Sequence, residues 1–358
     1  MKKNNSIFVL LLQLCLFSCN TSKDESAVTF QVSRTDFKDW EGFFKIEDAI
    51  PLQESEKSFL SNARKCLVST SRIVYWDYKV KRVVLFDTEG NLIGDVGGTG
   101  HAQSEHSDIK DLYFDKKNDV IRIMDERGIA NYSAVDGRYK GREELDFEEL
   151  GECEGFISVA NKYLFFNPRG KHSILSCEGK VTSGLRKSYG PFQKAYNHFY
   201  TYTDSLRVIS DYGDFYIDSY NKGVLKKRFI INLGEKALPQ GRKPTSRNEL
   251  YQAENGTNYF TSIINSCETS KWLYLRLVGY KNMAYDCFIN KDTGQAFTGA
   301  TDKKSPIGVI DCDRHFFYAI IYPDLLSDDS YIKYFMDNRQ VGISDNPIIL
   351  KLSINDVR

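Results

Sequence analysis

The chain has 358 residues with 48 basic and 48 acidic side chains, so it has no net positive charge with which to attract nucleic acid. A hydrophobic content of 41% is typical of a globular protein, and residues 19–358 are enough for one large domain or two small ones. Tyr and Phe are abundant, with 22 and 23 residues, and both favour β-strands.

The N-terminus begins with Lys2 and Lys3, followed at residues 7–17 by a run that is apolar except for Gln13. As a helix this run would be about 16 Å long, whereas a membrane-spanning helix needs about 20 residues. A basic start before a short apolar core predicts a secretory signal peptide at residues 1–18. For the cysteine that ends this run, Cys19, lipidation competes with two alternatives: an ordinary signal peptide with an incidental cysteine, or a buried hydrophobic helix.

Leu16-Phe17-Ser18-Cys19 resembles the lipobox of bacterial lipoproteins, in which Leu stands three residues before Cys and a small residue just before it. The resemblance implies that cleavage follows Ser18 and that the thiol of Cys19 is lipidated. Residues 19–40 would then be a tether to the membrane, because Asn20 to Ala27 are polar or small. The expected location is the cell envelope, lipid-anchored at the outer membrane on its periplasmic or its surface face.

Six cysteines remain after Cys15 and Cys19 are set aside, and they are widely spaced: Cys66, Cys153, Cys177, Cys267, Cys287 and Cys312. The spacing contains no zinc motif. An exported protein meets an oxidising environment, which permits disulfides. We expect mostly buried free thiols, with room for one bridge whose pair the sequence does not identify.

Beyond residue 40 the chain reads as short β-branched and aromatic runs, such as residues 72–77, 82–87 and 91–96, separated by polar or glycine turns. Helical periodicity is strongest at residues 326–337. The expected fold class is all-β.

The ends of strong strands recur about every 44 residues, which is the signature of a repeat architecture. They stand at Asp77, Asp125, Asn167, Asp211, Val278 and Tyr322. One larger gap, between Asp211 and Val278, predicts an insertion at residues 234–257. Six units of about four strands predict a six-bladed β-propeller over residues 41–358. An array of immunoglobulin-like sandwiches would need units of about 100 residues.

Residues 83–141, from "VVLFDTEGNLIGD" to "VDGRYKG", resemble the six-bladed β-propeller lipoproteins of Bacteroides-type bacteria, which are related in shape to NHL and TolB-like propellers. "SDNPIILKLSI" at 344–354 resembles their last strand. In that family a Gly-Pro-Gly-Glu-Tyr loop is usual, whereas this chain has Gly100 to His106 without the proline and the aromatic residue. We expect an N-terminal strand at residues 43–52 to complete the last blade and close the ring.

In a propeller, the loops between second and third strands share one face with the loops between blades. This arrangement predicts a ring of polar and aromatic candidates for ligand binding. The candidates are Asp77, Tyr78, His101, Glu105, His106, Asp125, Arg127, Asn167, Arg169, Asp211 and Tyr212. Such a mixture can hold sugars or peptides by stacking and hydrogen bonds. The competing interpretation is that each Asp or Asn closes its own turn.

No catalytic residue, metal or cofactor is assigned from the sequence. His101, Glu105 and His106 are close together, but they lack metal-binding spacing such as HExxH. The expected function is that of a membrane-anchored envelope protein that binds or scaffolds a glycan, a peptide or a partner protein. The alternative is an enzyme, a lyase or hydrolase, that uses His and carboxylate groups at the channel mouth.

Overall fold

The computed structural model describes residues 26–32, 42–54, 59–188, 197–239, 243, 249, 258–300, 308–326, 330–339, 342 and 345–355. The predicted signal peptide and the lipidation site Cys19 lie outside these residues. Most of the predicted insertion at 234–257 does as well.

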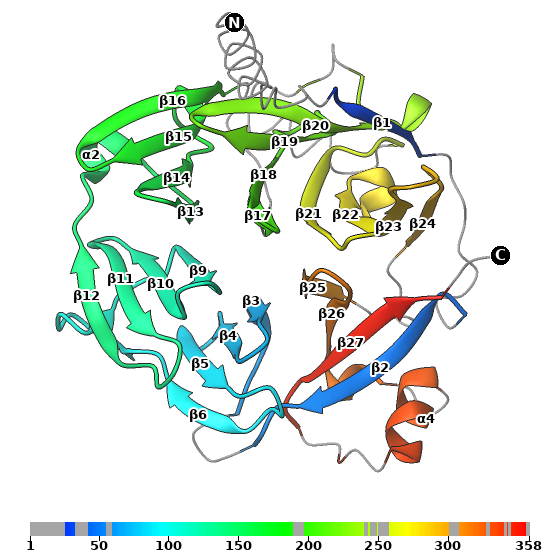
Figure 1. Cartoon of the computed structure of the whole chain (residues 1–358), viewed down its shortest axis with the longest axis horizontal. Helices are drawn as coiled ribbons and strands as arrows, with labels where there is room; N and C mark the ends of the chain where they lie inside the picture. The colour runs from blue at the N-terminus through cyan, green and yellow to red at the C-terminus, as the bar shows by residue number, and fades with distance from the viewer. Residues whose placement is uncertain are drawn as a thin grey trace, which may run out of the picture.

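Six sheets stand around one axis in chain order, as Figure 1 shows, which confirms the six-bladed β-propeller. Blade 1 contains β3 (Ala63–Val68), β4 (Ile73–Asp77), β5 (Arg82–Phe86) and β6 (Leu92–Asp95). Blade 2 contains β9 (Asp111–Asp115), β10 (Val120–Asp125), β11 (Gly128–Ser133) and β12 (Tyr139–Glu143). Blade 3 contains β13 (Gly155–Val159), β14 (Lys162–Phe166), β15 (His172–Glu178) and β16 (Val181–Lys187).

The second half of the ring follows the same plan. Blade 4 contains β17 (Phe199–Tyr202), β18 (Ser205–Ile209), β19 (Tyr216–Asn221), β20 (Val224–Asn232) and, as a fifth strand, β1 (Val28–Gln31). Blade 5 contains β21 (Ser262–Glu268), β22 (Trp272–Val278), β23 (Ala284–Asn290) and β24 (Ala296–Ala300). Blade 6 contains β25 (Gly308–Cys312), β26 (Phe317–Ile321), β27 (Ile348–Ile354) and β2 (Phe44–Pro51).

The first strand of each blade is nearest the axis, and successive strands lie further out (Figure 1). We call the face that carries the loops between second and third strands, and between blades, the rim face. The opposite face, which carries the turns between first and second and between third and fourth strands, is the hairpin face.

The hydrophobic core is a ring of six clusters, one between each pair of neighbouring blades. Middle strands such as β4 have neighbours on both faces, so all five of its residues are buried and its sequence is a continuous apolar run before Asp77. Trp76, for example, packs in the cluster between blades 1 and 2. A four-stranded sheet therefore depends on its neighbours to exclude water.

The ring closes through the N-terminal strand, as predicted for residues 43–52. β2 pairs antiparallel with β27, from Phe44 opposite Ile354 to Pro51 opposite Ile348, and Figure 1 shows β2, in blue, beside β27, in red. The buried side chain of Asn346 adds to the closure: its Oδ1 accepts from Leu60 N at 2.8 Å, and its Nδ2 donates to Gln53 O at 3.0 Å.

The predicted tether needs a correction, because residues 28–31 within it form strand β1. β1 pairs in parallel with β20, and Phe30 is buried with its ring 5.7 Å from that of Phe229. Phe30 and Val32 alternate with polar residues, so one side of this short strand covers apolar surface on blade 4. The chain is therefore fixed to the propeller at residues 28–32.

The other elements are short. The short parallel pair of β7 (Gly98–Thr99) and β8 (Glu105–His106) lies between blades 1 and 2, and α2 (Phe147–Leu150) lies between blades 2 and 3. Helix α4 (Tyr331–Asn338) overlaps the helical pattern expected at 326–337. The 3-10 helices are η1 (Gly234–Lys236), η3 (Tyr280–Asn282) and η4 (Pro323–Leu325). Within the described ranges, no helix combines the length and the apolar character that crossing a membrane requires.

The six cysteines from Cys66 to Cys312 are all free thiols, in agreement with the expectation of mostly free, buried cysteines. Five are buried and Cys312 is partly exposed. No disulfide links any two of these six.

Candidate functional site

The polar residues at the ends of the second strands lie on the rim face, as predicted, but their side chains point into the fold. Asp77 ends β4 and is fully buried. Its Oδ1 accepts from Lys79 N at 2.9 Å, which closes the following turn, and its Oδ2 accepts from Ser61 N at 2.6 Å. Ser61 precedes the innermost strand of the same blade, so Asp77 also fixes the chain where it enters blade 1.

The same contact recurs in the next two blades. Asp125 accepts from Ser107 N at 3.3 Å, and the Nδ2 of Asn167 donates to Leu150 O at 2.6 Å. The partner stands 16, 18 and 17 residues earlier for Asp77, Asp125 and Asn167, respectively. These three side chains thus anchor the loop that leads into their own blade, and Asp77 and Asp125 also close their own turns.

Asp211, in blade 4, binds side chains of blade 3 across the interface between the two blades. It is buried, and it accepts from Ser173 Oγ at 2.7 Å and from the guanidinium of Arg186 at 3.2 Å. Arg186 also contacts Asp218 at 2.6 Å. Burial raises the pKa of Asp218, although Arg186 opposes the effect. The group holds two blades together across their interface.

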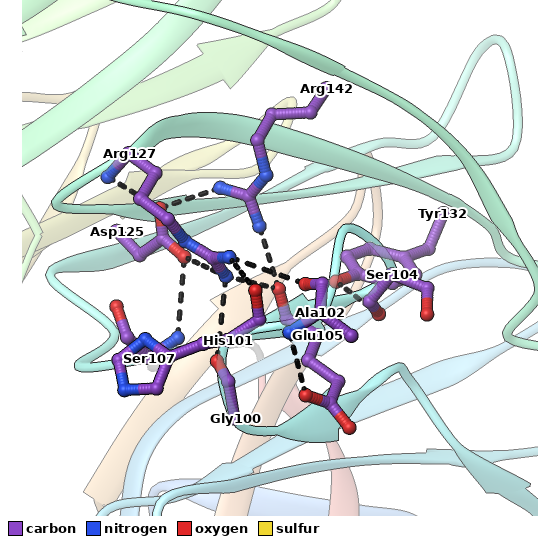
Figure 2. A network of polar contacts seen from close by, with 10 residues as sticks. All are labelled: Gly100, His101, Ala102, Ser104, Glu105, Ser107, Asp125, Arg127, Tyr132 and Arg142. Atoms are coloured by element: carbon purple, nitrogen blue, oxygen red, sulfur yellow. Dashed lines mark hydrogen bonds and ion pairs between the residues drawn. The ribbon is translucent and has the colours of Figure 1, made fainter.

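Four of the predicted residues do come together, at the loop between blades 1 and 2 (Figure 2): His101, Glu105, Asp125 and Arg127. The guanidinium of Arg127 donates to His101 O at 2.8 Å and to Glu105 O at 2.6 Å, and its Nη2 lies 3.3 Å from Asp125 Oδ2. Arg142, which the sequence analysis missed, contacts Asp125 Oδ1 at 2.6 Å and Glu105 O at 2.7 Å. Two guanidinium groups therefore hold the backbone of residues 100–106, which we call the clamped loop.

One side chain of the clamped loop and one from β11 also bond to its backbone. Glu105 Oε2 accepts from Ala102 N at 2.9 Å, and Tyr132 Oη donates to Ser104 O at 3.2 Å. A Cβ at Gly100 would lie 2.1 Å from Glu105 Oε2, so a side chain at this position would have to displace the Glu105 carboxylate. The residues that replace the usual Gly-Pro-Gly-Glu-Tyr pattern therefore still form an ordered loop.

The two histidines of the clamped loop are in different environments. His101 is exposed, whereas His106 is almost completely buried and its Nδ1 has no hydrogen-bond partner among the described residues. Burial lowers the pKa of His106, and the nearby Asp125 opposes this only in part. In the part of the chain that the structure describes, no three His, Cys, Asp or Glu side chains are placed to hold a metal ion.

Beside the clamped loop, the rim face of blade 1 exposes apolar side chains. Phe59, Tyr78 and Val80 are each more than half exposed. Thr99 Oγ1 donates to Lys81 O at 3.3 Å, and Lys81 forms an ion pair with Asp108 at 2.8 Å, so the turn of Tyr78 contacts the segment around the clamped loop. We call Phe59, Tyr78 and Val80 the apolar rim patch.

The remaining candidates lie further round the ring. Arg169 is exposed in blade 3 and pairs with Glu152, while Glu154 lies 3.9 Å away. Burial raises the pKa of Glu154. Tyr212 is half-buried in blade 4. The structure therefore places Arg169 and Tyr212 in separate sectors of the rim face from the clamped loop.

Charged pairs on the innermost strands were not predicted. Lys65 on β3 contacts Asp111 on β9 at 2.7 Å, and Asp111 also accepts from Phe156 N at 2.9 Å, so this carboxylate joins blades 1, 2 and 3. Toward the hairpin face, Lys116 pairs with Asp311 at 2.7 Å and links blade 2 to blade 6. Lysines and aspartates inside short apolar strands are the sequence signal that could have identified them.

His198 stands near this axial group and is buried against Phe166, with ring centroids 3.4 Å apart. Burial holds its pKa well below the usual value, and the nearby cations Lys65, Arg186 and Arg64 lower it further. Its stacking on Phe166 and its burial are those of a core side chain.

A family model described as "Domain of unknown function (DUF4934)" matches residues 33–353. The chain belongs to the DUF4934 family. The match covers strands β2 to β26 and all of β27 except its last residue, while β1 lies outside it. No curated protein matches the sequence.

Two solved structures resemble this DUF4934 protein over most of their length. A putative exported protein from Bacteroides fragilis is 12% identical, with a TM-score of 0.76 over 92% of this chain and 100% of that one. A member of the DUF4221 family from Bacteroides vulgatus is 10% identical, with a TM-score of 0.55 over 88% of this chain and 100% of that one. At such low identity the similarity shows the fold alone. The expected likeness to propellers of Bacteroides is thus confirmed.

Proposed function

We propose that this DUF4934 protein is an exported, lipid-anchored binding propeller of the cell envelope, which holds a peptide or a partner protein on the rim face of blades 1 and 2. The observation that carries the proposal is the apolar rim patch beside the clamped loop. Phe59, Tyr78 and Val80 expose apolar surface next to a loop that is already ordered.

Two physical arguments favour a peptide or protein over a small polar ligand. Aromatic side chains such as Tyr78 are enriched among the residues that contribute most to protein interfaces. Binding is also stronger when the surface is ordered in advance, because less conformational entropy is lost on association. The polar surroundings, with the ion pair of Lys81 and Asp108, fit the charged edge of such an interface.

The export and anchoring part of the proposal rests on the N-terminal sequence. A short apolar run ends at Leu16-Phe17-Ser18-Cys19, and the similar Bacteroides fragilis structure is described as a putative exported protein. Acyl chains on Cys19 would provide the membrane anchor, since each buried CH₂ contributes about 0.8 kcal/mol.

The binding proposal is tested by probing peptide and glycan arrays with a variant that begins at residue 26. We expect peptide signals that Tyr78→Asp abolishes and that Val181→Asp preserves, because Val181 is equally exposed but lies on the hairpin face. Peptide signals insensitive to Tyr78→Asp would contradict the proposed face. Signals confined to glycans, and lost in Tyr78→Asp, would replace the peptide by a sugar.

The anchor is tested separately in cells by comparing the full chain with its Cys19→Ala variant. We expect the variant to leave the membrane fraction. Retention equal to that of the parent chain would show that the anchor is wrong.

A further inference from the structure

The direction of strand β1 indicates from which side the N-terminus reaches the propeller. β1 is parallel to β20, with Val28 opposite Phe229 and Gln31 opposite Asn232. β20 begins at the turn of Lys222 and Gly223 on the hairpin face and ends at the rim face. β1 therefore runs from the hairpin face toward the rim face, along the outer edge of blade 4 (Figure 1).

The length of this segment limits how far the propeller can stand from an anchor at Cys19. Along β20, Val28 lies level with Phe229, which is about 17 Å from the hairpin end at Val224 at about 3.3 Å per residue. From Cys19 to Val28 a fully extended chain covers about 30 Å. The hairpin end of blade 4 thus lies within about 15 Å of a lipidated Cys19 when the segment continues in the direction of β1.

The hairpin face of blades 2 to 4 carries an exposed valine at each turn between third and fourth strands. These are Val135, Val181 and Val224, each more than half exposed. A cation stands close to each valine in sequence: Arg138, Lys180 and Lys222, all exposed. Of the nearby acids, Asp136 pairs with Arg138 and Glu178 pairs with Lys162. Apolar tips flanked by cations suit the boundary between acyl chains and anionic headgroups.

We propose that the hairpin face of blades 2 to 4 lies against the lipid bilayer, with Val181 and Val224 at the level of the headgroups. This inference rests on the anchor in the proposed function and extends it, because it fixes the orientation of the ring. The rim face, with the apolar rim patch, then points away from the membrane and is open to a partner.

The experiment uses the full lipidated chain in vesicles of phosphatidylethanolamine and phosphatidylglycerol that contain a headgroup spin label. A fluorophore is attached at Val224→Cys in one variant and at Tyr78→Cys in a second, both with Cys312→Ser because Cys312 is the partly exposed native thiol. Both positions are exposed, so the substitutions leave the core intact. We expect quenching of the label at position 224 to be at least threefold stronger than at position 78.

Equal quenching at the two positions, or stronger quenching at position 78, would overturn the orientation while leaving the anchor and the binding face intact. Vesicle flotation of the unlabelled chain distinguishes this from failure of the anchor: a chain that does not float overturns both the anchor and the orientation. Lys180→Glu with Lys222→Glu provides a further check. It should weaken quenching at position 224 in these vesicles but not in phosphatidylcholine alone, and equal weakening in both would contradict the headgroup contact.

Discussion

Replacing Asp125 with alanine should destabilise the interface between blades 1 and 2 more than any exposed charge substitution. Asp125 is fully buried and accepts from the backbone of Ser107 and Arg127 as well as from the guanidinium groups of Arg127 and Arg142. Its removal leaves the guanidinium of Arg142, whose side chain is only 8% exposed, without its carboxylate. The clamped loop also loses the charge that orients both arginines.

The expected loss of stability in Asp125→Ala follows from the burial of the Asp125 carboxylate. Removing one partner of a buried ion pair costs about 3–5 kcal/mol, because the remaining charge is left uncompensated. The matched control is Glu178→Gln, which breaks the pair with Lys162, where both side chains are about half exposed. Such a surface pair contributes about 0–1 kcal/mol.

The contribution of Asp125 to the free energy of unfolding should also depend on pH. Burial by itself would raise the pKa of Asp125, but hydrogen bonds from Arg127 N and from Arg142 lower it overall. A carboxyl group whose folded pKa is lowered stabilises the fold above its unfolded pKa of about 4 and loses this contribution as the pH falls through the folded pKa. The difference between the parent chain and Asp125→Asn should therefore shrink below about pH 4.

The assay is urea unfolding monitored by tryptophan fluorescence at pH 7 and pH 3.5, with Trp76 in the affected interface. Asp125→Ala should unfold at a clearly lower urea concentration than Glu178→Gln. Asp125→Ala combined with Arg142→Ala should lose less than the sum of the single variants, because the two residues contact each other. Equal midpoints for Asp125→Ala and Glu178→Gln, or strict additivity, would refute the reasoning.

Three further predictions concern the backbone, the closure and the thiols. Gly128→Ala should lower the free energy of unfolding, measured in urea, by more than about 2 kcal/mol, because φ is +126° and a Cβ would lie 2.1 Å from a carbonyl oxygen of the neighbouring strand. Gly179→Ala is the control and should lower it by about 1 kcal/mol, because the space around Gly179 is open. Equal losses for the two variants would contradict this prediction. A variant that begins at residue 53 should have a much lower melting temperature than one that begins at residue 33, since only the first lacks β2, the strand that closes blade 6. Similar melting temperatures would argue against the closure. In a variant that begins at residue 26, a thiol reagent should modify Cys312 first and the five buried cysteines only after unfolding; rapid reaction of a second thiol would show otherwise.

The repeat could be predicted from the sequence because each blade places an apolar run before a polar residue at the end of its second strand. Asp77 and Asp125 mark two such ends, and both stand where the repeat predicts them. The closing strand was predictable for a related reason: a sheet that ends with β27 alone would leave an open edge. By contrast, β1 has four residues and one buried side chain within the strand, too little to register as a strand pattern.

The roles of the polar residues were less predictable, because side-chain direction depends on the tertiary fold. An aspartate at the end of a strand is compatible with an exposed ligand contact and with a buried anchor, and the contact of Asp77 with Ser61 distinguishes them. Arg142 was missed because it comes from the outermost strand of blade 2 and reaches the clamped loop only in the folded ring. Lys65 and Asp111 likewise meet only because β3 and β9 are neighbours around the axis.

The pairing of β2 with β27 also determines when the protein can finish folding. Glu47 and Ser353, which bond across these strands, are 306 residues apart, so the first strand of the ring is synthesised long before its partner exists. Until β27 has been synthesised, blade 6 lacks its outer pair of strands and the ring cannot close. The order of synthesis thus delays completion of the ring until β27 pairs with β2.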